Sequence, residues 1–119
     1  MFSIEDYDRI CGGFPAVHKV VQWRGAQVWK IGEKVFAIGR QTDDGGVAVT
    51  FKVNDMVWEI YRDSCGVIPA PHLASRGMKW LQRQDDSSID DTTLADLLAQ
   101  SYEMVVSNLT KKRRAELGV

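Results

Sequence analysis

The sequence contains few residues that bind metals or form covalent cross-links, with two cysteines and two histidines among its 119 residues. Cys11 and Cys65 form no C-x-x-C pair and have no histidine cluster near them, so the spacing of a zinc site is absent. His18 and His72 likewise lack a partner at metal-ligand spacing. We therefore expect no metal and no cofactor. Both thiols are expected to be free and reduced, as in a cytoplasmic protein.

Signals for secretion and for membrane insertion are also missing. The first ten residues, MFSIEDYDRI, carry acids and lack the basic and apolar stretches of a signal peptide. No apolar run approaches the length of a membrane span. The composition is 45% hydrophobic and 26% charged, which is typical of a soluble globular chain with a sizeable core. We expect a single domain over residues 1–119, with no membrane partner.

Motifs for catalysis are absent as well. The sequence has no G-x-S-x-G element, no phosphate-binding P-loop and no dinucleotide fingerprint. The acidic segment at 85–91 lacks the pattern of a calcium loop, and TDDGG at 42–46 predicts a turn. We therefore expect that the protein is not an enzyme, and no small-molecule substrate is indicated.

Strands dominate the first half of the chain. Segments rich in Val, Ile, Phe and Trp predict strands at 18–24, 26–32, 34–40 and 46–52, with a fifth at 78–83. The string WKIGEKVF indicates a tight hairpin, because Gly32 suits the first central position of a type II′ turn. In that register Trp29 lies opposite Phe36. Alternation then places one set of side chains on the core face: Val21, Trp23, Trp29, Ile31, Phe36, Ile38, Val47, Val49 and Phe51.

Helices are expected around this sheet. A capping pattern and apolar spacing predict a short helix that begins after Ser3, a second at about 54–64, and a long C-terminal helix from Asp90 or Asp91. The elements predict an α+β fold of two layers. An antiparallel sheet of about five strands carries the N-terminal, middle and C-terminal helices on one face. The residues expected to converge between the layers are Trp29, Phe36, Phe51, Trp80, Leu97, Leu98, Tyr102 and Val105.

Positive charge is distributed unevenly, although the net charge is only −1. Bases gather on the predicted strands, whereas most acids lie on helices and in loops. If the helices cover one face of the sheet, the other face presents Arg24, Lys30, Lys52, Lys79 and Arg83. Such a patch is suited to phosphate groups, which release counterions when they are neutralised. The alternative stays open that strands disfavour acids and place long basic side chains on their solvated face.

Four consecutive cations lie near the end of the sequence: Lys111, Lys112, Arg113 and Arg114. In the last turns of a helix, cations offset the negative end of the helix dipole, and each contributes roughly 0.3–1 kcal/mol. Four successive residues also point to all sides of a helix. This segment therefore indicates a solvated helix end first, and a secondary nucleic-acid contact second.

Several strings together resemble the MmcQ/YjbR family of small bacterial proteins. They are GGFPAV at 12–17, WKIGEKVFAIG at 29–39, VAVTFK at 47–52, IPAPHL at 68–73 and LLAQSYEMVVSNLTKKRR at 97–114. The sequence departs from the family pattern at Glu33, where many relatives carry a second glycine. The resemblance implies a two-layer α+β fold similar to the CyaY sheet and to secretion chaperones. It also implies DNA binding through a "double wing" arrangement.

Two functional hypotheses remain. The first is a DNA-binding module that contacts phosphates with its basic sheet face, aided by the C-terminal cations. The second is a protein-interaction or chaperone-like adaptor that uses the same face, with Val28, Val35, Ala37 and Leu81 as contacts. A DNA-binding surface is expected to be contiguous and positive, whereas an adaptor surface exposes a connected apolar patch.

Overall fold

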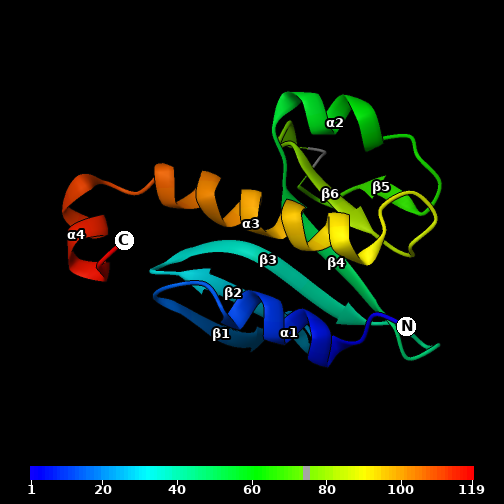
Figure 1. The fold of residues 1–119 in the computed structure, drawn as a ribbon, viewed down its shortest axis with the longest axis horizontal. Helices are drawn as coiled ribbons and strands as arrows, with labels where there is room; N and C mark the ends of the chain where they lie inside the picture. The colour runs from blue at the N-terminus through cyan, green and yellow to red at the C-terminus, as the bar shows by residue number, and fades with distance from the viewer. Residues whose placement is uncertain (74–75) are drawn as a thin grey trace.

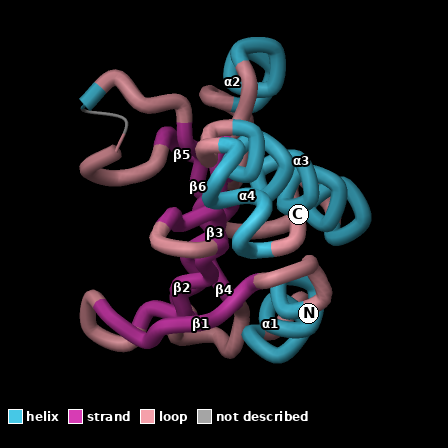
Figure 2. The backbone as a smooth tube through the Cα atoms, turned by 90° about the vertical axis from the view of Figure 1, so that its left-hand side faces the viewer, coloured by secondary structure: helices cyan, strands magenta, loops and turns pink. Residues whose placement is uncertain are grey.

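The computed structural model describes residues 1–73 and 76–119, which form a six-stranded antiparallel sheet covered by helices on one face (Figures 1 and 2). The strands are β1 (Val17–Gln22), β2 (Ala26–Ile31), β3 (Lys34–Gln41), β4 (Val47–Lys52), β5 (Val67–Pro69) and β6 (Trp80–Arg83), in the spatial order β1-β2-β3-β4-β6-β5. The helices are α1 (Ile4–Gly12), α2 (Asp55–Tyr61), α3 (Asp91–Ser107) and α4 (Lys111–Leu117). The predicted α+β fold is confirmed, with the short edge strand β5 as the additional strand.

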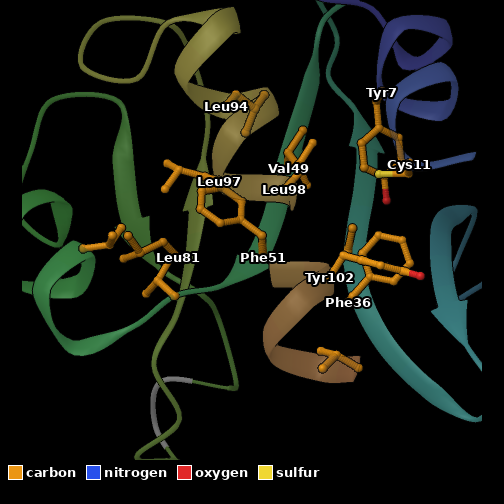
Figure 3. Close-up of a cluster of buried hydrophobic side chains, with 14 of the residues drawn as sticks. Tyr7, Cys11, Phe36, Val49, Phe51, Leu81, Leu94, Leu97, Leu98 and Tyr102 are labelled. Atoms are coloured by element: carbon orange, nitrogen blue, oxygen red, sulfur yellow. The ribbon is translucent and has the colours of Figure 1, made fainter. Parts of the chain in front are cut away.

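The core lies between the sheet and the helices, and aromatic rings occupy its centre (Figure 3). Phe36 is fully buried and meets the rings of Phe14 and Tyr102 edge-on, with centroids 5.8 and 5.4 Å away. Most of the predicted core residues belong to this cluster: Phe36, Phe51, Leu97, Leu98, Tyr102 and Val105. Trp29 packs against its edge, where the indole N–H donates to Asp8 of α1 at 2.9 Å.

A β-bulge in β3 alters the predicted register beyond the hairpin turn. Trp29 pairs with Ala37 and not with Phe36, so β3 contains one extra residue. An extra residue reverses the alternation of side chains beyond it. Ile38 therefore points away from the helices, and its predicted place in the core is wrong. Gly39 takes the helix side, where a Cβ atom would lie 2.5 Å from the ring of Tyr7.

Two tryptophans predicted for the core lie elsewhere. Phe51 pairs with Leu81, and both side chains belong to the core. Trp80 is the neighbour of Leu81 in β6 and therefore points to the opposite face, where it is buried with 6% of its surface exposed. Trp23 lies in the turn between β1 and β2, where 51% of its surface is exposed. Val21 in β1 is also exposed.

The strands β3 and β4 separate at one end of the sheet, where α3 crosses them (Figure 1). Their pairing ends at Ala37 and Phe51. Beyond that point, the buried hydroxyl of Ser101 donates to the Phe36 carbonyl at 2.7 Å and accepts from the Lys52 backbone N–H at 2.9 Å. These two hydrogen bonds satisfy backbone groups that the interrupted ladder leaves unpaired.

The long C-terminal helix predicted from Asp90 or Asp91 is present as α3, but it does not extend to the cations at 111–114, which lie in the separate helix α4. α3 ends at Ser107, and Thr110 caps α4 by accepting the Arg113 backbone N–H at 3.1 Å. The four cations at 111–114 thus occupy the first turn of α4, where the helix dipole is positive. A cation there is disfavoured by roughly 0.3–1 kcal/mol, so the predicted stabilisation by the dipole is wrong.

The two cysteines differ in accessibility. Both are free, with Cys11 buried in α1 and Cys65 exposed after α2. Burial, reinforced by the nearby charge of Asp8, raises the pKa of the Cys11 thiol far above its usual range. Only the thiolate reacts with common thiol reagents.

Among the helices of the described residues, none combines the length and the apolar character that a membrane-spanning helix requires.

We expect native protein at neutral pH to react with one equivalent of an aromatic disulfide reagent, at Cys65. A second equivalent should react only after unfolding in guanidinium, because Cys11 is then exposed to solvent. The Cys65→Ser variant is the control, and it should show no reaction until it is unfolded. Rapid native reaction of two thiols in the parent protein would contradict the burial of Cys11.

Candidate nucleic-acid interface

The face of the sheet opposite the helices carries a groove made of two adjoining hollows, which we call the open-face groove. The hollows have volumes of about 300 and 680 Å³ and share Trp23, Ile38 and Leu73 in their walls. One wall is the β1–β2 turn, and the other is the described part of the segment between β5 and β6, which leaves the sheet on the side away from the helices (Figure 2). The floor consists of side chains from the middle strands. At the end where β3 and β4 separate, the smaller hollow also reaches Val105 of α3 and Asn108, the residue that caps this helix.

The open-face groove is strongly basic. Five cations line it: Arg24, Lys34, Arg40, Lys52 and Arg76. No acid is among its lining residues in the described part of the chain. Within that same part, none of the five cations forms an ion pair. A concave surface lined by one sign of charge concentrates the potential and attracts oppositely charged ligands.

Several acids of the protein are paired with cations outside this groove. Such pairs join Arg9 to Asp6, Lys19 to Asp8, Lys79 to Asp55, Arg83 to Asp91 and Arg113 to Glu33. A chain of almost neutral net charge thereby leaves one face with uncompensated positive charge. The predicted separation of charge between the strands and the helices is present at this face.

The structure brings only two of the nine predicted nucleic-acid-binding residues into the groove, Arg24 and Lys52. Lys30 points to the same face, because its neighbour Trp29 faces α1, but it lies outside the groove. The ammonium group of Lys79 lies 2.8 Å from the Asp55 carboxylate of α2. Lys79 is therefore partly neutralised by its partner.

Arg83 is not on the basic face at all. Its side chain is 3% exposed, and its guanidinium group lies 2.7 Å from the Asp91 carboxylate at the start of α3. Its Nε atom donates to the Ile89 carbonyl at 2.8 Å, and the group stacks above the ring of Phe2. The predicted phosphate contact of Arg83 is therefore wrong, because this residue fastens the loop before α3 to the sheet.

We expect Arg83→Met to lower the free energy of unfolding by about 1–3 kcal/mol, because the buried Ile89 carbonyl loses its donor. Urea unfolding monitored by circular dichroism measures this change. The matched control is Arg24→Met, which removes an exposed cation and should change stability by less than about 0.5 kcal/mol. Weakened DNA binding by Arg83→Met at unchanged stability would contradict the structural role assigned to Arg83.

The four consecutive cations of α4 do not form one surface. Arg113 Nε lies 3.2 Å from the Glu33 carboxylate in the β2–β3 turn, and Arg113 and Leu117 pack beside Gly32. Arg114 is half-buried, whereas Lys111 and Lys112 are exposed. The helix therefore docks on the hairpin, and two lysines remain available for a ligand.

Sequence reasoning missed three groove cations, Lys34, Arg40 and Arg76, and it placed Trp23 in the core. Their positions depend on the bulge and on chain segments that meet only in the fold. Four residues other than glycine have positive φ values in the described chain: Ala16 (62°), which precedes β1, and Trp23 (50°), Arg24 (63°) and His72 (69°), which mark the groove. Residues other than glycine in this left-handed region cost roughly 1–3 kcal/mol each and concentrate at functional sites. The last three of the four line the groove.

The contacts predicted for an adaptor are mostly inaccessible. Val28, Ala37 and Leu81 are fully buried, and Val35 alone is half-exposed, in the groove wall. Apart from Met56 and Ile60, which share α2, the large apolar side chains that are exposed in the described chain lie on separate elements: Met1, Val21, Trp23 and Met78. Within the described ranges, no group of three or more His, Cys, Asp or Glu side chains is arranged to hold a metal ion.

Comparisons with known proteins bear on both the sequence and the fold. The sequence matches the family model YjbR over residues 12–104. The crystal structure of the Deinococcus radiodurans protein DR2400, which carries the domain DUF419, superimposes with a TM-score of 0.85. The two chains are 24% identical, and the match covers 100% of this chain and 90% of the other. No curated protein matches the sequence. At 24% identity, the similarity to this crystal structure shows only that the two proteins share a fold.

Proposed function

Because the chain belongs to the YjbR family, we propose that it is a bacterial, cytoplasmic DNA-binding protein. In this proposal the protein binds phosphate groups in its open-face groove and catalyses no reaction. One observation carries the proposal: five cations without ion pairs in the described structure converge on one concave face that no described acid lines. Phosphate oxygens supply the negative charge that this face lacks. The family resemblance to "double wing" proteins supports the same surface.

The mode of binding follows from the side chains available. Arg24, Arg40 and Arg76 offer forked guanidinium groups that bind phosphate oxygens in pairs, and two lysines add point charges. None of the four helices α1 to α4 lies on this face (Figure 2), so in the described part of the chain no long helix is placed to read the edges of paired bases. The groove is therefore suited to positioning on the phosphate backbone more than to reading a duplex sequence.

One observation favours a protein-interaction adaptor as the second candidate. Met56 and Ile60 lie one turn apart on α2 and are 67% and 57% exposed. Residues four apart on a helix form one surface, and an apolar pair in water is a common contact for a partner. No residue of α2 lines the groove, so substitutions in α2 separate the two candidates.

The test of DNA binding is a fluorescence anisotropy titration of a labelled duplex at several salt concentrations. Affinity should fall as salt rises, with a slope of log K against log salt of about −4.5 if all five cations each neutralise one phosphate. A shallower slope would indicate that fewer phosphates are neutralised. Most nonspecific DNA-binding proteins bind more tightly than about 0.1 mM at physiological salt. If no binding is seen below that concentration, the DNA-binding hypothesis is rejected in favour of the adaptor.

A further inference from the structure

The exposed indole of Trp23 is the feature of the groove that phosphate binding leaves unexplained. Trp23 lies in the walls of both hollows, and half of its surface is open to solvent. Its turn spans only Trp23, Arg24 and Gly25, because Gln22 pairs with Ala26. All three turn residues have positive φ values. Glycine adopts this conformation without strain, whereas tryptophan does not, so the large side chain is present at an energetic cost.

An indole at the mouth of a basic groove matches one ligand chemistry. Nucleic-acid bases stack on aromatic side chains, and this stacking is available at every base because every base has a π face. In a duplex, those faces are already stacked on neighbouring base pairs, and a protein groove meets only phosphates and base edges. Trp23 can therefore stack on an unpaired base, whereas it has no base face to stack on in a duplex.

The interior of the groove is also suited to an unpaired base beside its phosphates. Gln82 donates to the Thr50 hydroxyl at 3.3 Å on the floor, so amide and hydroxyl groups lie next to the apolar side chain of Ile38. Arg24 and Arg40 line the same hollow. A positively charged groove that carries an aromatic side chain for stacking is the arrangement that binds single strands in other folds.

From these observations we infer that the ligand of the open-face groove is single-stranded DNA, with one unpaired base stacked on Trp23 and the flanking phosphates held by Arg24 and Arg40. The inference rests on the proposed function and specifies the form of nucleic acid. It assigns Trp23 a role in binding that the phosphate contacts do not require. It also accounts for a tryptophan in a turn where glycine is less strained.

The experiment compares a labelled single strand of about 12 nucleotides with its duplex, using anisotropy at one salt concentration. Wild type should bind the single strand more tightly than the duplex. Trp23→Ala should weaken single-strand binding by about 5- to 150-fold, the loss of one stacked base. Trp23→Phe keeps a π face and should lose less. Both variants should bind the duplex as wild type does.

Trp23→Gly separates stacking from folding, because glycine relieves the turn while it removes the ring. We expect this variant to unfold at the same or higher denaturant concentration and to bind single strands as weakly as Trp23→Ala. Wild-type affinity of Trp23→Gly for single strands would overturn the inference. Inorganic polyphosphate that competes as well as the single strand would also overturn it, because stacking would then contribute nothing.

The failure of this inference is distinguishable from the failure of the proposed function. If the duplex binds with a steep salt dependence and the Trp23 variants are unaffected, the inference is wrong and the DNA-binding proposal stands. If neither form of DNA binds, both are wrong. If a protein partner binds the groove and DNA does not, the occupant is a different class of macromolecule and both are again wrong.

Discussion

Replacing Phe36 with alanine is expected to lower the free energy of unfolding by about 3–5 kcal/mol, the range for large aromatic residues in a packed core. Phe36 is fully buried, and its ring meets Phe14 and Tyr102 edge-on. Those two rings stack on each other at 4.8 Å, so the three form one cluster. Loss of the central ring removes both edge contacts and leaves a cavity between β3 and α3.

Guanidinium unfolding measured by tryptophan fluorescence and by circular dichroism gives the value. The matched control is Met56→Ala on α2, where the side chain is 67% exposed and the change should stay within about 0.5 kcal/mol. An unfolding midpoint for Phe36→Ala close to that of the parent protein would show that the ring is not central to the core. The assigned position of the bulge would then also be wrong.

Local chemistry was sufficient to predict the hairpin and the helix starts. The turn at Gly32 has a φ of 59°, which suits the predicted type II′ turn, and Ile31 pairs with Lys34. Ser3 and Asp6 form the predicted capping box, with hydrogen bonds of 2.9 and 3.1 Å between side chain and backbone. These features depend on residues that are neighbours in the sequence, so one segment contains the whole signal.

The bulge in β3 illustrates what the sequence did not reveal. Nothing in the string KVFAIGR distinguishes a regular strand from one with an extra residue. The choice depends on Tyr7, whose ring leaves room only for Gly39 at that position, and on the Ser101 hydroxyl at the Phe36 carbonyl. Both partners come from helices far away in the chain. Pattern reasoning therefore assigned the right face up to Phe36 and the wrong face beyond it.

The same bulge builds the candidate site. With regular alternation, Arg40 would share the face of Phe36 and point toward the helices. The extra residue turns Arg40 to the open face, where it lines the groove with Thr50 of β4 and Gln82 of β6. The sequence thus predicted a basic face opposite the helices, but only two of the five cations that line its groove, Arg24 and Lys52. Arg83 shows the opposite error: it was predicted on the basic face but points toward the helices. There it pairs with the carboxylate of Asp91, the first residue of α3.

Reversing two groove cations should separate this site from the tail. We expect Arg40→Glu combined with Lys52→Glu to weaken DNA binding by on the order of 100-fold or more, because two phosphate attractions become repulsions. The salt slope should become shallower by roughly 1.8, which corresponds to two lost phosphate contacts. Arg40 is exposed and Lys52 half-buried, so unfolding measurements should show a folded variant.

The matched control reverses Lys111 and Lys112, which changes the net charge by the same amount at exposed positions of α4. Equal charge makes the long-range repulsion of DNA equal, so any difference between the variants reports local contacts. The tail variant should lose affinity only modestly, with a slope close to that of the parent protein. If the tail reversal abolishes binding while the groove reversal changes little, then α4 is a nonspecific arm and the open-face groove is not the DNA site.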